Sequence, residues 1–395
     1  MKSATLCLCV AVMALPAAAK LGPAGVHGEP PDDTRAWAEC DRNRPNPPKI
    51  TAVDGKPPSD AFVIVGMNRE RTLSNFTHSD GSPLRWDFKD GVLQINRKGP
   101  CGYVKGEWAD FQLHVEWMTP KGCEKQKWGG NSGVVIHPGR RYEIQIIDSS
   151  RCDGSLGDAN PAPDYADGQA GAVYGQTPPL VNPARLPGEW QTYDIIFHAA
   201  LWEKGVLIHP ATVSVIYNGV LVQDNWELRE RVPPPKDDKR SGRIYFQNHG
   251  YDVSFRNVWL RELKPRWEND THGGPYVKPD KVRDLREKTA AELFAEYDPS
   301  AAPSAELVNQ TLEIICYSRD ARYLKAVDRE EKRYLAALEK MDRTMLDAQR
   351  AGLLRLKLVY GGLVGWKIIE DGRPLQRKCE ELIKKYDYKG TTYWW

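Results

Sequence analysis

The run GGNSGVVIHPGRRYEIQIIDS, residues 129–149, carries side chains that can transfer protons and bind hydroxyl groups: Glu143, Gln145 and Asp148. Side chains two positions apart in a strand share a face, so Glu143 and Gln145 project together while the isoleucines beside them enter the core. Asp148 joins them only if a β-bulge intervenes, which the two consecutive isoleucines before it allow. The alternative is an exposed sheet face with solvated polar groups, but the neighbouring glycine-rich runs favour a functional cleft.

A histidine supplies a second candidate group. His249 in YFQNHGY lies two residues after Gln247, and both share a face if the strand persists. Imidazole titrates at about pH 6.5, which suits a general base or acid, although a structural histidine is the competing interpretation. Glu143, Asp148 and His249 also offer oxygen and nitrogen donors to a divalent cation. Since the sequence has no compact ligand motif, metal dependence stays open.

Three further residues are candidates for binding a ligand. Asn131 lies in a glycine-rich turn that lets the backbone approach a ligand closely, and it is otherwise a turn residue only. Trp128 beside this turn and Tyr174 in GAVYGQ offer aromatic rings that could stack on a ligand. Core packing is the alternative for both rings.

Short apolar runs between residues 61 and 263 must position these groups. Several alternate apolar and polar residues, and Asn218-Gly219 between VSVIY and VLVQ is a strong hairpin signal. Many strands and few helices predict a mainly β domain, an antiparallel β-sandwich or jelly roll. Apolar residues then recur at helical spacing in ARYLKAVDREEKRYLAALEK. We expect, in order, a signal peptide at 1–19, an extended arm at 20–59, the β-sandwich at 60–264, a linker at 265–284 and a C-terminal helical extension at 285–395.

Composition and charge limit the partners. The chain has 55 Lys and Arg against 53 Asp and Glu, so its charge gives no argument for nucleic acid or for an anionic membrane. The first residues, MKSATLCLCVAVMALPAAAK, read as a signal peptide whose apolar run is too short to span a bilayer. They predict an exported protein, periplasmic or extracellular. The helical extension is interpreted as a cap on the sandwich or as a contact between two copies of the chain.

Cysteine usage agrees with an oxidising compartment. An even number of cysteines remains after the predicted cleavage, and none forms a C-x-x-C pair, which favours disulfides over metal sites. Connectivity is not readable from the spacing, although both cysteines of the helical extension could pair with each other. The six are Cys40, Cys101, Cys123, Cys152, Cys316 and Cys379.

Four runs, taken in chain order, resemble the 3-keto-disaccharide hydrolase family, over about residues 60–264. The runs are GGNSGVVIHPGRRYEIQIIDS, YADGQAGAVYGQTPPLVNPARLPGEWQTYDIIFHA, ATVSVIYNGVLVQDNWEL and GRIYFQNHGYDVSFRNVWLREL. The resemblance implies a concanavalin A-like sandwich and cleavage of glycosides already oxidised at C3. A C3 ketone acidifies the C2 proton, so a base can remove it and the C1 substituent can leave by β-elimination.

This reaction needs a base, an acid and a group that stabilises the enolate. The residues that the resemblance and the pattern together indicate are Glu143, Asp148 and His249 for catalysis, and Gln145, Asn131, Trp128, Tyr174 and Gln247 for binding the carbohydrate. Beyond the open question of a cation, the sequence requires no cofactor.

The sequence is also compatible with two other functions. Laminarinase-type endo-glycosidases carry Glu-x-Asp-x-Glu on a comparable strand, but here Gln145 replaces the middle carboxylate. A retaining glycosidase also needs two carboxyl groups about 5 to 5.5 Å apart. A non-catalytic carbohydrate-binding module is the third hypothesis, since sandwiches of this kind often only bind.

Overall fold

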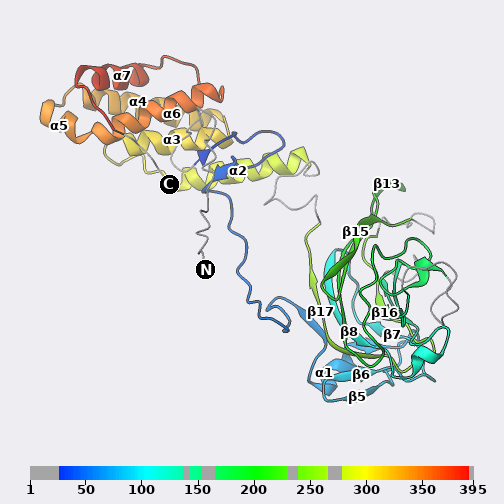
Figure 1. Cartoon of the computed structure of the whole chain (residues 1–395). Helices are drawn as coiled ribbons and strands as arrows, with labels where there is room; N and C mark the ends of the chain where they lie inside the picture. Colours follow the sequence, from blue (N-terminus) through cyan, green and yellow to red (C-terminus); the bar gives the residue numbers. More distant parts are fainter. Residues whose placement is uncertain (1–25, 137–141, 153–164, 230–238, 266–277, 391–395) are drawn as a thin grey trace, which may run out of the picture. The chain divides into compact units, whose positions relative to one another are not determined.

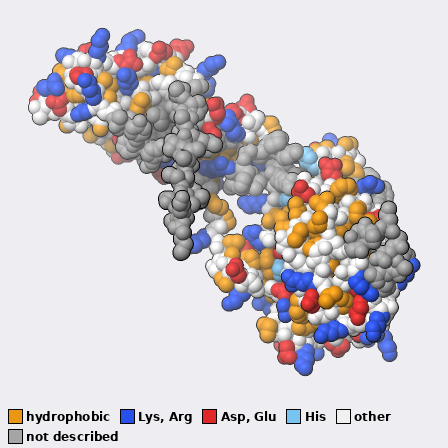
Figure 2. Space-filling model, in the orientation of Figure 1, with side chains coloured by type: hydrophobic (Ala, Val, Ile, Leu, Met, Phe, Trp, Pro, Cys, Tyr) orange, Lys and Arg blue, Asp and Glu red, His pale blue; other side chains and the backbone are white. Residues whose placement is uncertain are grey.

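The computed structural model describes residues 26–136, 142–152, 165–229, 239–265 and 278–390 (Figure 1). The chain forms two compact units. One is the sandwich, Pro48–Pro265; the other combines Met1–Pro47 with Arg266–Trp395. The predicted signal peptide lies outside the described residues. In the space-filling view, basic and acidic side chains are interspersed over the visible surface of both units (Figure 2).

The sandwich consists of two antiparallel sheets, as the alternating pattern predicts. The larger sheet has the order β15 (Val220–Glu227), β14 (Thr212–Tyr217), β11 (Gln191–His198), β8 (Phe111–Met118), β17 (Ser254–Glu262), β6 (Val92–Gln94) and β5 (Asp87–Lys89), with β3 (Phe62–Val65) also paired to β17. The smaller sheet has the order β10 (Tyr142–Ile146), β9 (Ser132–Ile136), β16 (Ile244–Phe246), β7 (Gly102–Val104) and β4 (Phe76–Thr77). Shorter elements are α1 (Arg69–Ser74), η1 (Cys123–Lys125), η2 (Ala166–Gly168) and the hairpin of β12 (Leu201–Glu203) with β13 (Val206–His209).

The core lies between the two sheets, and the period-two alternation of each strand determines which side chains enter it. In β8, every second side chain is fully buried, ending with Trp117, while the residues between them are half-buried. The Asn218-Gly219 hairpin is confirmed, because both residues have positive φ, 50° and 81°, as a type I′ turn requires. Because Tyr142, Ile144 and Ile146 of β10 enter this core, the side chains between them face outward from the smaller sheet.

Six helices of the second unit are described: α2 (Pro279–Glu296), α3 (Ala305–Tyr317), α4 (Ala321–Leu338), α5 (Arg343–Ala348), α6 (Arg350–Gly365) and α7 (Pro374–Lys385). The predicted helical extension is therefore present. The first helix begins at Pro279, inside the range where the sequence predicts a linker, because a proline at the first helical position is well placed to start a helix.

The predicted N-terminal arm is divided between the two units: its residues up to Pro47 belong to the helical unit, and those from Pro48 on belong to the sandwich. Trp37 and the alanines beside it are buried in the helical core, and the Trp366 indole donates to Gly28 O at 3.1 Å. Arg42 pairs with the buried Glu313 at 2.7 Å. Two short strands, β1 (Val26–His27) and β2 (Cys40–Asp41), pair within the arm. The sequence does not predict that this segment packs on the helices, because only one large apolar side chain anchors a segment otherwise rich in proline and charge.

The predicted disulfides are not formed. Cys40, Cys101, Cys123, Cys316 and Cys379 are free thiols. The Cys316 thiol instead donates to Leu312 O at 3.6 Å within its own helix. Burial raises the pKa of the Cys379 thiol to about 12 and that of Cys316 well above its ordinary value, so both behave as apolar core groups. Among the described residues, no helix has the length and apolarity that crossing a bilayer requires.

Candidate functional site

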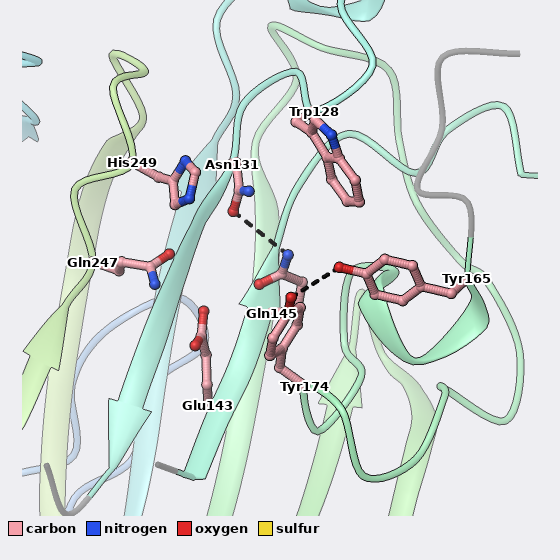
Figure 3. A pocket seen from close by; sticks show the side chains of 8 residues that line it. All are labelled: Trp128, Asn131, Glu143, Gln145, Tyr165, Tyr174, Gln247 and His249. Carbon is pink, nitrogen blue, oxygen red and sulfur yellow. Dashed lines mark hydrogen bonds between the residues drawn. The ribbon is translucent and has the colours of Figure 1, made fainter. Parts of the chain in front are cut away.

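A cavity of about 270 Å³ opens on the outer face of the smaller sheet. Seven of the eight residues that line it are among those singled out from the sequence (Figure 3). The lining residues are Trp128, Asn131, Glu143, Gln145, Tyr165, Tyr174, Gln247 and His249. The sheet and three loops thus bring together polar groups and aromatic rings, the combination that binds a small polar ligand.

Glu143 and Gln145 form the floor of this cavity from strand β10. Their side chains share a face, as period-two alternation predicts, and are only 8% and 1% exposed. Strand β10 pairs with β9 on one edge, and on the other edge Tyr174 N donates to Glu143 O at 2.9 Å. Because both edges are hydrogen-bonded, the backbone at Glu143 is held in place, and its carboxylate is directed to the outer face of the sheet.

The Gln145 amide has two orientations, which give its nitrogen different hydrogen-bond partners. With its nitrogen toward the turn, it donates to Asn131 Oδ1 at 3.5 Å (Figure 3). With the amide turned over, its nitrogen donates to Ser132 O and to Glu143 Oε1, both at 3.2 Å, and both ends of the amide are then satisfied. We favour this second orientation, because an ionised carboxylate gains most from a donor beside it.

Three aromatic residues form one wall. The Trp128 and Tyr165 rings lie 5.6 Å apart, and the Tyr165 and Tyr174 rings lie 6.2 Å apart in an edge-on arrangement. The two tyrosine hydroxyls share a hydrogen bond of 2.8 Å, which leaves one O–H to donate elsewhere (Figure 3). This wall offers flat apolar faces together with a hydroxyl donor.

Tyr165 was not identified from the sequence. It precedes η2, where a Cβ on Gly168 would collide with the Tyr165 ring. The glycine three positions after the tyrosine is therefore the local signal, since it lets the ring fold back over the turn.

Gln247 and His249 form the opposite wall, just beyond the end of β16. Gln247 is fixed through its backbone: its N–H donates to Gly133 O at 2.9 Å, and Ser132 Oγ donates to its carbonyl at 2.7 Å. Between the two residues, Asn248 anchors the loop by donating to Asn96 O at 2.8 Å. His249 is exposed at the rim of the cavity.

Asp148 does not line the cavity. Strand β10 ends at Ile146, Ile147 is buried in the core as well, and Asp148 N donates to Gly129 O at 2.9 Å beyond the end of the strand. The Asp148 carboxylate instead accepts hydrogen bonds from Ser150 N at 3.0 Å and Ser150 Oγ at 2.7 Å. This arrangement is an Asx-type turn that closes the loop after the strand.

The position of Asp148 also matters for a divalent cation, because Asp148 is one of its candidate ligands. Of its three candidate ligands, only Glu143 and His249 line the cavity. Across the described residues, no three His, Cys, Asp or Glu side chains come together in a metal-binding arrangement.

Comparison with known proteins identifies a family whose model matches the sandwich. Residues 67–261 match the model of the 3-keto-alpha-glucoside-1,2-lyase-like domain. A proposed glycosyl hydrolase from Parabacteroides distasonis with a crystal structure is 35% identical, over 55% of this chain and 93% of that one, with a TM-score of 0.46. A second from this organism is 23% identical, over 51% of this chain and 99% of that one, with a TM-score of 0.36. Alginate lyase Aly36B is 12% identical, over 52% of this chain and 97% of that one, with a TM-score of 0.32. No curated protein matches the chain.

Proposed function

Since this chain belongs to the 3-keto-alpha-glucoside-1,2-lyase-like family, we propose that it cleaves glycosides whose sugar ring carries a ketone at C3. The family and its relatives are carbohydrate-active proteins of the glycosyl hydrolase kind. The observation that carries the proposal is the Glu143 carboxylate, held on a rigid strand in a cavity that also contains an imidazole and an aromatic wall.

In the proposed reaction Glu143 is the base. Its carboxylate takes the proton from C2, and the electrons of the C2–H bond move into the C3 carbonyl to form an enolate. The amide of Asn131 is the donor that we assign to the enolate oxygen. When the carbonyl re-forms, the C1–O bond breaks and a C1–C2 double bond results. His249, as imidazolium, gives its proton to the leaving oxygen.

The rest of the cavity supports binding. The rings of Trp128, Tyr165 and Tyr174 offer apolar faces to the C–H face of a sugar ring, and a hydroxyl of the tyrosine pair serves as a further donor. Water can then add to the unsaturated product to give the free 3-keto sugar, so that the net reaction is hydrolysis. We further propose that the protein is exported, on the strength of the signal-like residues 1–19.

The test compares a 3-keto-glucoside with its unoxidised parent, using the wild-type chain and Glu143→Gln. We expect turnover of the keto form only, and a loss of at least about 100-fold in Glu143→Gln, because an amide cannot accept the proton. The matched control is Glu262→Gln, at the exposed end of β17. Turnover of the parent glucoside would favour an endo-glycosidase instead. Saturable binding of either sugar without turnover would indicate a carbohydrate-binding module.

A further inference from the structure

Gln247 presents a buried hydrogen-bond acceptor to the cavity. Its side-chain oxygen Oε1 is buried and accepts no hydrogen bond from any part of the chain that the structure describes. Buried polar atoms in folded proteins are paired in the large majority of cases, and each exception calls for an explanation. Because this atom belongs to a residue that lines the ligand cavity, the simplest explanation is a donor on the ligand.

The backbone segment that carries this acceptor is held in place before any ligand binds. The backbone of Gln247 is hydrogen-bonded in both directions to β9, through Gly133 O and Ser132 Oγ. The next residue, Asn248, donates to both Asn96 O at 2.8 Å and Gly99 O at 2.5 Å. Because this backbone is already ordered, ligand binding does not have to order it, and more of the free energy of the hydrogen bond is available for selectivity.

We propose that Gln247 is a specificity-determining residue, whose side-chain oxygen accepts a hydrogen bond from one of the two hydroxyl groups that flank the C3 ketone. The assignment rests on the proposed function. A carbonyl oxygen cannot donate, so the ketone itself cannot satisfy Gln247 Oε1. The ketone is therefore turned toward a donor such as the Asn131 amide, and the flanking hydroxyl toward Gln247. This fixes which edge of the sugar faces each wall and brings C2 over Glu143.

The consequence is discrimination between sugars that differ by one hydroxyl. A site built to bind a hydroxyl rejects the analogue that lacks it, because the buried partner is then left unpaired. Loss of one such bond corresponds to roughly 10- to 100-fold in kcat/KM.

The experiment measures kcat/KM for a 3-keto-glucoside and for its 2-deoxy and 4-deoxy analogues. It uses the full chain as wild type, Gln247→Met and Gln247→Glu. Methionine keeps the length and flexibility of the side chain but offers no strong acceptor, whereas glutamate keeps the acceptor. We expect the wild type to disfavour one analogue by roughly 10- to 100-fold, Gln247→Met to lose most of this ratio, and Gln247→Glu to retain it. A ratio within one variant is insensitive to a general loss of folded protein.

Equal ratios in the wild type and Gln247→Met would overturn the assignment while leaving the proposed function intact. If the wild type turns over none of these sugars, the proposed function fails. The same comparison is then made by calorimetric binding of the three sugars. In that case, discrimination that disappears in Gln247→Met supports the acceptor role, and discrimination that persists, or an absence of binding, overturns it.

Discussion

Because Gly133 has no side chain, the Glu143 carboxylate can occupy the space beside it. The two residues lie on adjacent strands, and a Cβ built on Gly133 would lie 2.5 Å from Glu143 Oε1 and 3.0 Å from its carboxyl carbon. Real Cβ atoms do not approach other heavy atoms so closely, so any other residue here would displace the carboxylate. The glycine in GGNSGVV is thus part of the site, although it contributes no functional group.

Gly133→Ala tests this relationship. The backbone of Gly133 does not need positive φ, so alanine should be tolerated by the fold and should act mainly by moving Glu143. We expect kcat/KM on a 3-keto-glucoside to fall by roughly 100-fold, as displacements of about 1 Å at a reacting group can produce. The control is Gly361→Ala in α6, where an added Cβ meets nothing within 4 Å. Wild-type rates in Gly133→Ala would show that the reaction does not depend on the position of Glu143.

Asp148→Asn separates the structural role of Asp148 from the catalytic role predicted for it. Asparagine keeps the side-chain oxygen that accepts from Ser150, so we expect kcat/KM to stay within a few-fold of wild type. Asp148→Ala removes these hydrogen bonds and should lower the free energy of unfolding by about 1 kcal/mol, measured by denaturant titration. A loss in Asp148→Asn as large as in Glu143→Gln would return Asp148 to the catalytic set.

Glu143 and Asp148 show which side-chain positions can be predicted from the sequence and which cannot. Glu143 lies within a strand, where the period of two determines which face each side chain takes, and its placement beside Gln145 follows from spacing. Asp148 lies past the strand end, where no period applies and its own turn with Ser150 decides its direction. Tyr165 was missed for a related reason, because a loop contact over Gly168 brings it to the cavity.

The tyrosine pair offers a test of the aromatic wall. In Tyr165→Phe and Tyr174→Phe the ring remains but the shared hydroxyl hydrogen bond is lost, so we expect a reduction in kcat/KM of roughly 3- to 30-fold, with the fold unchanged. Trp128→Ala removes a stacking surface instead and should mainly raise KM. Tyr323→Phe, in the helical core, is the hydroxyl-deletion control. Unchanged kinetics in both wall variants would mean that these hydroxyls do not contact the substrate.

Glu116 predicts a pH dependence of stability in the sandwich. Burial alone would raise the pKa of its carboxyl group, but hydrogen bonds from Asn257 at 2.8 Å and Arg256 at 2.6 Å outweigh this effect and lower the pKa overall. The carboxylate therefore stabilises the fold above the unfolded-state pKa of about 4.3, and this contribution is lost as pH falls through the lowered value.

Thermal unfolding of the wild type and Glu116→Gln at pH 7 and at pH 3 checks this sign. We expect the wild type to be the more stable at pH 7, and the difference between the two proteins to shrink at pH 3, where the glutamate is closer to neutral. A difference of equal size at both pH values would contradict the lowered pKa of Glu116.

Trp37 tests whether the N-terminal arm is an integral part of the helical unit. The side chain is 7% exposed and packs in the helical core, so Trp37→Ala should destabilise that unit by about 3–5 kcal/mol. Hydrogen exchange should then report faster opening of α3 and α4, while β8 and β11 stay protected, because the sandwich has a separate core. Trp86→Ala, in the sandwich core, should give the reverse pattern. Unchanged exchange in α3 and α4 of Trp37→Ala would show that the helices fold without the arm, and that the arm only lies on their surface.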